Sequence, residues 1–295
     1  MRPVPAVEPR LLALLGRVWP SIPPAVARAD ALGFSWASVS TPFVRYEGAR
    51  AVAHVGVIEL PLVIDGRQRM VGSIHGVCTD VDRRGRGHAR ALMDAALAHC
   101  RARYGTVLLT TLIPRFYARH HGFHVVPEHA FVRPTSVTRP SAGGRRLSER
   151  SVDADLLARL LAQRAPVSER LGALDAATVF VFALLLGRGD FSRAYYHAGL
   201  DVMTVHEVVG RTLVLYDVVG AAIPPLAELL EAIGAQIDRV VTCFVPDRFG
   251  AGFCAEPWDR ARVQALGDGS FAGLMARGAP MTGSEPLMLP VTVRT

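Results

Sequence analysis

Apolar and polar positions in the first half of the chain follow patterns that predict two short helices and then a series of strands. Residues 9–18 and 24–32 place apolar side chains at helical spacing. The strand-like runs that follow are separated by turns at Glu47-Gly48 and Asp65-Gly66, which is typical of an antiparallel meander. We expect these three strands at residues 42–47, 51–64 and 70–81.

The next segment contains a loop rich in arginine and glycine and then a strong helical pattern. Apolar residues repeat at helical spacing over residues 89–102. We expect a buried strand at 106–112, a short helix at 116–120 and a last strand at 123–126.

The second half of the chain repeats the order of the first. We expect strands at 193–198, 200–207 and 211–219, a helix at 225–233 and a buried strand at 239–244. The residues Leu-Leu-Thr-Thr-Leu-Ile-Pro-Arg-Phe at 108–116 also resemble Val-Val-Thr-Cys-Phe-Val-Pro-Asp-Arg-Phe at 240–249. These similarities predict an internal repeat.

The chain length of 295 residues is typical of two domains of roughly 150 residues each. Residues 133–146 contain two prolines and a Gly-Gly pair without periodicity, so we expect the linker there. We place the first domain at residues 1–135, the linker at 136–146 and the second domain at 147–295.

The composition excludes several classes of protein. The longest apolar run, residues 178–186, is shorter than the roughly 20 residues of a membrane span. The first residues lack an apolar signal core, so we expect a cytoplasmic protein that meets no membrane. Four cysteines without a CxxC pair argue against a disulfide framework and against a zinc site, and we expect no metal.

The net charge of +7 raises the question of a nucleic-acid partner. However, the arginines are spread along the chain between acidic residues, and the one dense cluster lies at residues 83–86. Basic charge also suits a small polyanionic ligand, and we expect no nucleic acid.

Residues 76–93 form a strand, a cationic glycine loop and a helix. Glycines let consecutive backbone N–H groups point at one place, and the start of the helix adds unpaired donors and a positive dipole end. Such a loop binds a pyrophosphate, and the arginines add charge-assisted contacts. The segment lacks the GxGxxG spacing of Rossmann proteins and the Gly-Lys-Ser/Thr ending of P-loop proteins.

The hexapeptide Arg84-x-x-Gly87-x-Ala89 resembles the Arg/Gln-x-x-Gly-x-Gly/Ala signature of the GNAT acetyltransferase superfamily. Val81 stands where that family usually has a proline. Residues 116–123, Phe-Tyr-Ala-Arg-His-His-Gly-Phe, resemble its second motif. The resemblance implies an α/β (α+β) fold of tandem units, each with a mixed, mostly antiparallel central sheet flanked by helices. It also implies an acetyl-CoA-dependent N-acetyltransferase that releases coenzyme A.

The resemblance implies which residues hold acetyl-CoA. The backbone of the fourth strand would pair with the pantetheine arm, the loop would hold the pyrophosphate, and the exit of the fifth strand would touch the thioester. The residues at these positions are Val77, Cys78, Thr79, Arg84, Gly85, Arg86, Gly87, His88, Ala89, Arg90, Leu112 and Ile113.

The same resemblance makes Tyr117 the general acid that protonates the departing thiolate, and the alternative is a packing aromatic. Glu59 and His75 are the candidates for the general base. His120 and His121 are nearer to Tyr117 in sequence but are more typical of a solvated helix end. A water chain, or an amine taken from solution in its neutral form, would need no base.

The second half has lost the cofactor loop, because residues 219–224 keep one glycine and no arginine. This resembles the degenerate second GNAT unit of the enhanced-intracellular-survival aminoglycoside acetyltransferases, which are longer and have a third unit. Such a copy would wall the acceptor pocket or form a homodimer interface. Its strand acids Asp201, Glu207 and Asp217 could attract a cationic amine, although such residues are more often outward-facing and solvated.

We therefore expect an enzyme that acetylates a primary amine of a small molecule, such as an antibiotic or another toxic amine. A protein or peptide N-acetyltransferase and a non-catalytic acetyl-CoA sensor are the alternatives. Retention of both motifs argues against the sensor.

Overall fold

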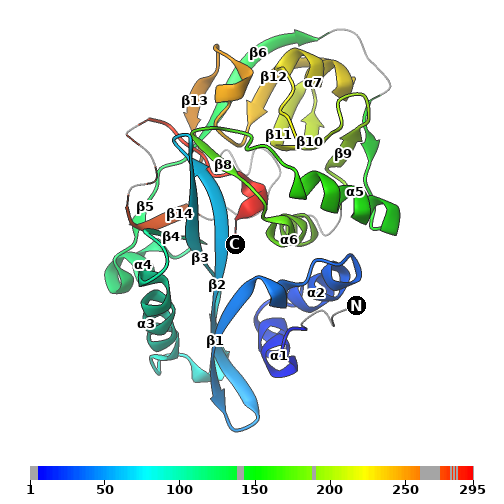
Figure 1. Cartoon of the computed structure of the whole chain (residues 1–295). Helices are drawn as coiled ribbons and strands as arrows, with labels where there is room; N and C mark the ends of the chain where they lie inside the picture. Colours follow the sequence, from blue (N-terminus) through cyan, green and yellow to red (C-terminus); the bar gives the residue numbers. More distant parts are fainter. Residues whose placement is uncertain are drawn as a thin grey trace.

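The computed structural model describes residues 6–137, 143–187, 191–259, 273–279, 281, 283 and 285–294. Two seven-stranded sheets form the framework of the described part (Figure 1). In these ranges no helix is long and apolar enough to cross a membrane.

The first sheet is built from the predicted meander and the strands that follow it. Its strand order is β1 (Ser40–Glu47), β2 (Arg50–Ile64), β3 (Arg67–Thr79), β4 (Thr106–Thr111), β14 (Gly273–Gly278) and β5 (His124–Val125), with β8 (Leu171–Ala173) paired to β2. Strands β3 and β4 are parallel and the other neighbours are antiparallel.

The second sheet has the same plan. Its strand order is β13 (Cys254–Pro257), β6 (His129–Val137), β12 (Ile237–Thr242), β11 (Thr212–Val219), β10 (Val202–Val209), β9 (Ala194–His197) and β7 (Arg145–Arg146). Only β11 and β12 are parallel among the pairs described here. Each unit therefore has an antiparallel meander, a helix and a parallel strand in the same order. The predicted fold class and the internal repeat are confirmed.

The two sheets exchange strands. Strand β6 follows the first unit in sequence but pairs with β12 of the second, and β14 lies near the chain end but pairs with β4 and β5 of the first. Each sheet therefore contains a strand from the other side of the expected domain boundary at residues 135–147. Residues 133–137, which lie in the expected linker, belong to strand β6.

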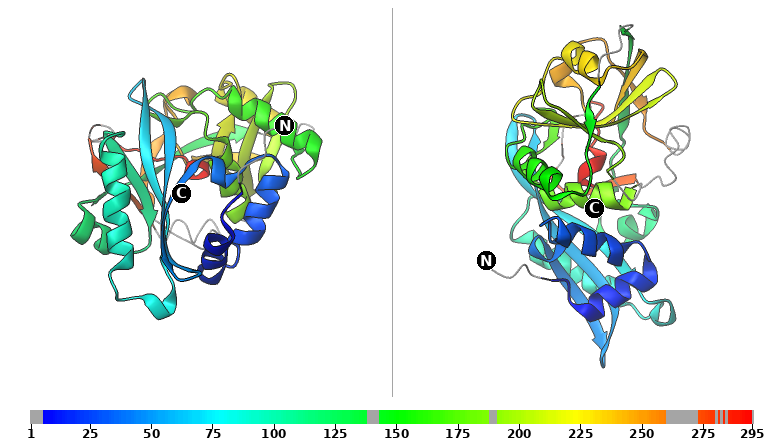
Figure 2. Two further views of the ribbon diagram at one scale, coloured as in Figure 1. Left: turned by 60° about the horizontal axis from the view of Figure 1, so that its bottom comes forward. Right: turned by 90° about the vertical axis from the view of Figure 1, so that its right-hand side faces the viewer.

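Helices cover the sheets and fill the space between them. Helices α1 (Pro9–Val18) and α2 (Ile22–Ala31) lie on one face of the first sheet, and α3 (His88–Arg101) and α4 (Pro114–His121) lie on the other (Figures 1 and 2). The second unit contributes α5 (Ser151–Ala162), α6 (Ala177–Gly187) and α7 (Leu226–Ile233).

The apolar helix α6 lies between the two units, next to α2 (Figure 2). Its residues pack in a hydrophobic core that contains side chains of both halves, including Phe34, Ile58, Phe180 and Met203. The two units therefore share one core.

The sequence predicted most elements of the repeat and misplaced some ends. Strand β3 ends at Thr79, because Asp80 caps a 3₁₀ turn, η2 (Val81–Arg83), by accepting a hydrogen bond from the Val81 N–H. The last strand of the first unit is reduced to β5. Helices α5 and α6 were not predicted.

Candidate active site

The two parallel strands of the first sheet separate in the middle of the sheet. Strands β3 and β4 pair only over Gly72–Ile74 and Val107–Leu109. Beyond Ile74, β3 continues to Thr79, but no described strand pairs with its β4-side edge. Unpaired backbone groups inside a sheet need another hydrogen-bonding partner. Val77, Cys78 and Thr79 lie on this open stretch.

A glycine bulge shapes the opening. The β2–β3 register shifts between His54 and Gly56, and Gly76 has a φ of 57° in the left-handed region. The Gly76 carbonyl accepts a hydrogen bond from His54 Nδ1 at 2.8 Å, and a Cβ at Gly76 would lie 3.1 Å from the His54 ring. Glycine therefore suits both the backbone conformation and the close approach.

A buried carboxylate fixes the end of β3 at the start of the cationic loop. Asp80 is 5% exposed and accepts hydrogen bonds from Arg17 at 2.7 Å and from Arg50 at 2.6 Å. Burial alone would raise its pKa, but the hydrogen bonds and charges of Arg17 and Arg50 hold the pKa below its usual value. Asp80 is therefore ionised at neutral pH and anchors the loop.

The loop has the shape of an anion site. Gly85 and Gly87 have φ values of 77° and 79°, and nothing lies within 4 Å of a Cβ built on either. Helix α3 begins at His88 without a side-chain cap, so no side chain takes its first N–H groups. These donors and the positive helix end are therefore left without a side-chain partner.

The arginines of the loop divide into two groups. Arg83 is bound to Glu47 at 2.7 Å and to Asp82 at 2.9 Å. Arg84, Arg86 and Arg90 are exposed and form no ion pair within 4 Å of a carboxylate among the described residues. The charge of Arg86 helps to lower the pKa of Glu47 after the larger effect of Arg83, and Arg84 donates to the Thr79 carbonyl at 3.3 Å. The cations that the motif requires are therefore available to a ligand. His88 lies 3.4 Å from Glu47, and Ala89 is in the first turn of α3.

Tyr117 lies at the other end of the opening. It is 6% exposed and packs against Phe116 and Phe123. Its hydroxyl forms a hydrogen bond with the side chain of Thr111, the last residue of β4. Burial raises the pKa of Tyr117 to about 12. The phenol therefore keeps its proton at neutral pH, as a general acid must.

Two apolar side chains are exposed in the turn that precedes the helix of Tyr117. Leu112 is 70% exposed and Ile113 is 60% exposed, in the turn between β4 and α4. Exposed apolar side chains next to a polar opening are suited to contact a ligand.

His75 directly follows Ile74, the last residue of β3 that pairs with β4. Its Nε2 lies 2.8 Å from Ser40 Oγ, and its ring packs edge-on against Trp36. Complete burial, and then the neighbouring His54, hold the pKa of His75 well below its usual value. His75 is therefore a neutral imidazole next to the opening.

Glu59 lies elsewhere. It is opposite Gly72, inside the paired part of β3, and its carboxylate accepts a hydrogen bond from the Tyr104 hydroxyl at 2.7 Å. Tyr104 follows the C-terminal end of α3, while the cationic loop is at the N-terminal end. The structure does not bring Glu59 to the loop. The choice of base stays a prediction.

The acids named in the second unit all have arginine partners. Asp201 binds Arg159 at 2.7 Å, Glu207 binds Arg193 at 2.8 Å, and the fully buried Asp217 binds Arg164 at 2.9 Å. The Arg159 and Tyr196 hydrogen bonds lower the pKa of Asp201 to about 2. None of the three carboxylates offers uncompensated charge, and their role toward an acceptor stays a prediction.

The parallel strands of the second unit also stop pairing before β11 ends, and a buried carboxylate on the unpaired stretch is bonded to other side chains of this unit. Strands β11 and β12 pair only as far as Leu215 and Thr242. Asp217 follows on β11 and is bonded to Arg164 and to Thr292 in the C-terminal 3₁₀ turn η4 (Val291–Val293). The turn after β11 has no arginine, as the sequence predicted.

Sequence reasoning missed two features of this site. Asp80 was not singled out, because its partners Arg17 and Arg50 are distant in the sequence. Trp36 was also missed; it contacts both His75 and Phe182 of α6. In the sequence, a lone tryptophan between helix and strand was the only signal.

Comparison with known proteins agrees with this geometry. Residues 11–126 match the acetyltransferase (GNAT) domain. A conserved protein from Enterococcus faecalis V583, described as a candidate N-acyltransferase, superposes with a TM-score of 0.53 at 14% identity, covering 91% of this chain and 69% of that chain. Eis1 from Mycobacterium abscessus superposes with a TM-score of 0.51 at 15% identity, covering 80% of this chain and 64% of that chain.

At such identities the likeness to these structures shows the fold, and this chain spans about two thirds of the length of each. A search of the curated proteins found no match.

Proposed function

We propose that this chain transfers the acetyl group of acetyl-CoA to a primary amine of a small molecule, because residues 11–126 match the acetyltransferase (GNAT) domain. The observation that carries the proposal is a single open strand–loop–helix site. It has exposed arginines that form no ion pair with a carboxylate among the described residues, and the corresponding turn of the second unit, at residues 219–224, has no arginine.

The cofactor fits this site in three places. The free edge of Val77–Thr79 offers backbone partners for the amides of the pantetheine arm. The loop from Arg84 to Arg90 offers N–H groups and guanidinium groups for the pyrophosphate. The exposed Leu112 and Ile113 offer apolar contact near the thioester.

The reaction follows from the groups at the end of the opening. The amine nitrogen attacks the thioester carbonyl carbon, the C–S bond breaks, and the thiolate takes the proton of Tyr117. The tyrosinate then regains a proton that the acetylated nitrogen has released. His75 borders the opening but binds a proton weakly, so we propose that the amine attacks in its neutral form.

The acceptor side belongs to both units. Trp36 packs against His75 on one side and against Phe182 of α6 on the other, with ring centroids 4.9 Å and 4.4 Å apart. The half-buried Trp36 suits contact with an amine on an apolar or ring-bearing molecule, including an antibiotic.

Binding of acetyl-CoA measured by calorimetry, together with thiol release in the presence of antibiotic amines, polyamines and peptides, tests the proposal. We expect one site per chain, and we expect Gly87→Val to abolish binding, because a side chain there strains the backbone at a φ of 79°. The control is Gly210→Val, which strains a hairpin turn of the second unit in the same way.

Two equivalent sites, or unchanged affinity in Gly87→Val, would refute the cofactor assignment. Turnover with peptides only would favour the peptide N-acetyltransferase. Binding without turnover on any amine would favour the sensor.

A further inference from the structure

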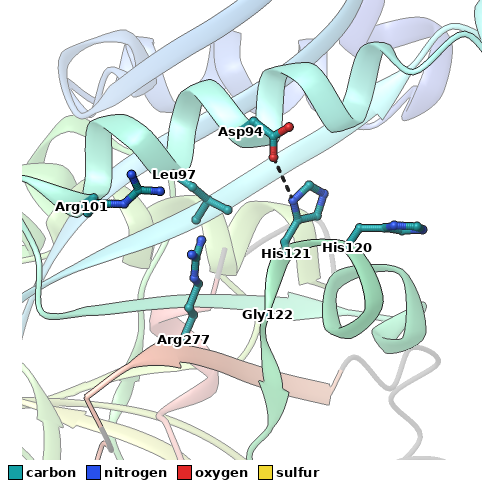
Figure 3. A pocket seen from close by; sticks show the side chains of 7 residues that line it. All are labelled: Asp94, Leu97, Arg101, His120, His121, Gly122 and Arg277. Atoms are coloured by element: carbon teal, nitrogen blue, oxygen red, sulfur yellow. Dashed lines mark ion pairs between the residues drawn. The ribbon is translucent and has the colours of Figure 1, made fainter.

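A second candidate site lies on the outer face of the first unit, beside α3, the end of α4 and β14 (Figure 3). It is a surface cavity of about 400 Å³. Its lining residues are Asp94, Leu97, Arg101, His120, His121, Gly122 and Arg277. We call it the α3–α4–β14 cavity.

This cavity lies along the C-terminal half of α3, and its lining residue Asp94 is one helical turn from Arg90 of the cofactor loop. His88 is the first residue of α3 and Arg101 is the last. Because an α-helix rises about 1.5 Å per residue, these two residues lie ~20 Å apart along the helix. Asp94, Leu97 and Arg101 follow one another at helical spacing, so one face of the C-terminal half of α3 forms a wall of the cavity.

Two arginines from distant parts of the chain converge on this cavity. Arg101 and Arg277 point toward the same space beside Leu97 (Figure 3). Within the described ranges neither guanidinium has a carboxylate or another hydrogen-bond partner. Two like charges in one cavity repel each other, and a shared anion removes that repulsion.

His121 adds an unsatisfied buried group to the same cavity. Its side chain is 0% exposed, and neither ring nitrogen has a hydrogen-bond partner among the described residues. The Asp94 carboxylate is 3.5 Å from Nδ1, which is long for a hydrogen bond. A buried imidazole whose one polar neighbour is this distant carboxylate is costly, so the ring is an observation, independent of the arginines, that points to a ligand.

We propose that the α3–α4–β14 cavity binds a small multivalent anion through Arg101 and Arg277, beside His121. Carboxylate and phosphate groups both match the fork of a guanidinium group, so the shared chemistry is an anionic oxygen cluster. A bound anion would join the exchanged strand β14 to α3, which begins at the cofactor loop, and to α4, which carries Tyr117. The cavity is therefore placed to stabilise the first unit.

Titration of the full chain with inorganic phosphate and with citrate, at constant ionic strength, tests the site. The ring resonances of His121, assigned with His121→Gln, report binding in this cavity, and calorimetry gives the affinity. We expect at least one of the two anions to move these resonances in a saturable manner. Stronger binding of citrate identifies a carboxylate ligand, and stronger binding of phosphate identifies a phosphate ester.

The variant with Arg101→Gln and Arg277→Gln together should bind at least about tenfold more weakly, because two charge-assisted contacts are lost. Arg103→Gln removes the same charge nearby from a residue that does not line the cavity, and it should bind like the wild type. If the double variant does not fold, Arg101→Gln alone gives the test, since this side chain is exposed.

Three results would overturn the proposal. These are the absence of binding by both anions, unchanged affinity in the arginine variants, and saturation that leaves the His121 resonances unmoved. The last result would place the anion at the Gly85–Gly87 loop instead.

Discussion

The hydroxyl of Tyr117 keeps its proton at neutral pH and lies beside Thr111 at the end of β4. Losing a general acid typically lowers the rate by about a hundredfold to ten-thousandfold. We expect Tyr117→Phe to lower turnover in this range and to leave the affinity for acetyl-CoA nearly unchanged, because the ring still packs against Phe116 and Phe123. Single-turnover kinetics and calorimetry measure the two quantities.

The pH profile and a matched tyrosine sharpen this prediction. Burial raises the pKa of Tyr117 to about 12. The phenol is therefore protonated well below pH 12 and loses its proton only as the pH rises through that value. Turnover should therefore show no loss from Tyr117 between pH 7 and 10. Tyr104→Phe removes a hydroxyl that binds Glu59 at the far end of α3, and it should keep turnover. Wild-type turnover in Tyr117→Phe would remove the residue from the mechanism.

Single residues could be read from the sequence where chemistry follows from local spacing. Gly85 and Gly87 were expected to let consecutive backbone N–H groups point at one place, and both have the positive φ values that glycine readily adopts. The partners of Asp201 and Asp217 could not be predicted. Arg159 and Arg164 reach them from another element, and only the fold places them there.

At the scale of elements, the junction of β3, η2 and α3 depends on Asp80. Asp80→Asn would remove the charge that holds Arg17 and Arg50, and charge-assisted hydrogen bonds are worth about 1.5–3 kcal/mol each. We expect the affinity for acetyl-CoA to fall by about tenfold or more, because the loop is no longer fixed. Calorimetry measures this loss.

Asp82→Asn is the control for this variant. Asp82 is half-exposed and also binds Arg50 and Arg83, at 3.3 Å and 2.9 Å. Pairs this exposed contribute little, so its affinity should stay within about twofold of the wild type. Equal losses in the two variants would show that overall charge, and not the anchoring of the loop, sets the affinity.

The elements of the meanders could be predicted because alternation shows directly in the sequence. Helix α6 could not, because its run of apolar residues has no polar face and a short run of this kind fits a buried strand equally well. The exchange of β6 and β14 could not be predicted either, because the pairing partner of each strand lies far away in the sequence.

At the scale of the whole molecule, the strand exchange makes each unit incomplete without the other. In a chain that ends at Arg146, the first sheet lacks β14 between β4 and β5, and it lacks β8 beside β2. Leu274 and Met275 of β14 are buried in the whole protein, so the loss of β14 exposes the apolar side chains that pack against them. At about 1.5–3 kcal/mol for each large apolar side chain, the loss approaches the 5–15 kcal/mol stability of a typical domain.

We therefore expect the chain of residues 1–146 to aggregate or to remain unfolded, and to bind no acetyl-CoA, although it contains the whole GNAT match. Co-expression with residues 147–295 should restore a soluble complex, because that segment supplies β8 and β14. In the intact protein, circular dichroism on heating should show one cooperative transition, since the two units share a core. A soluble and cooperatively folded chain of residues 1–146 with wild-type affinity would show that the exchanged strand is dispensable. The role of the second unit would then be limited to the acceptor.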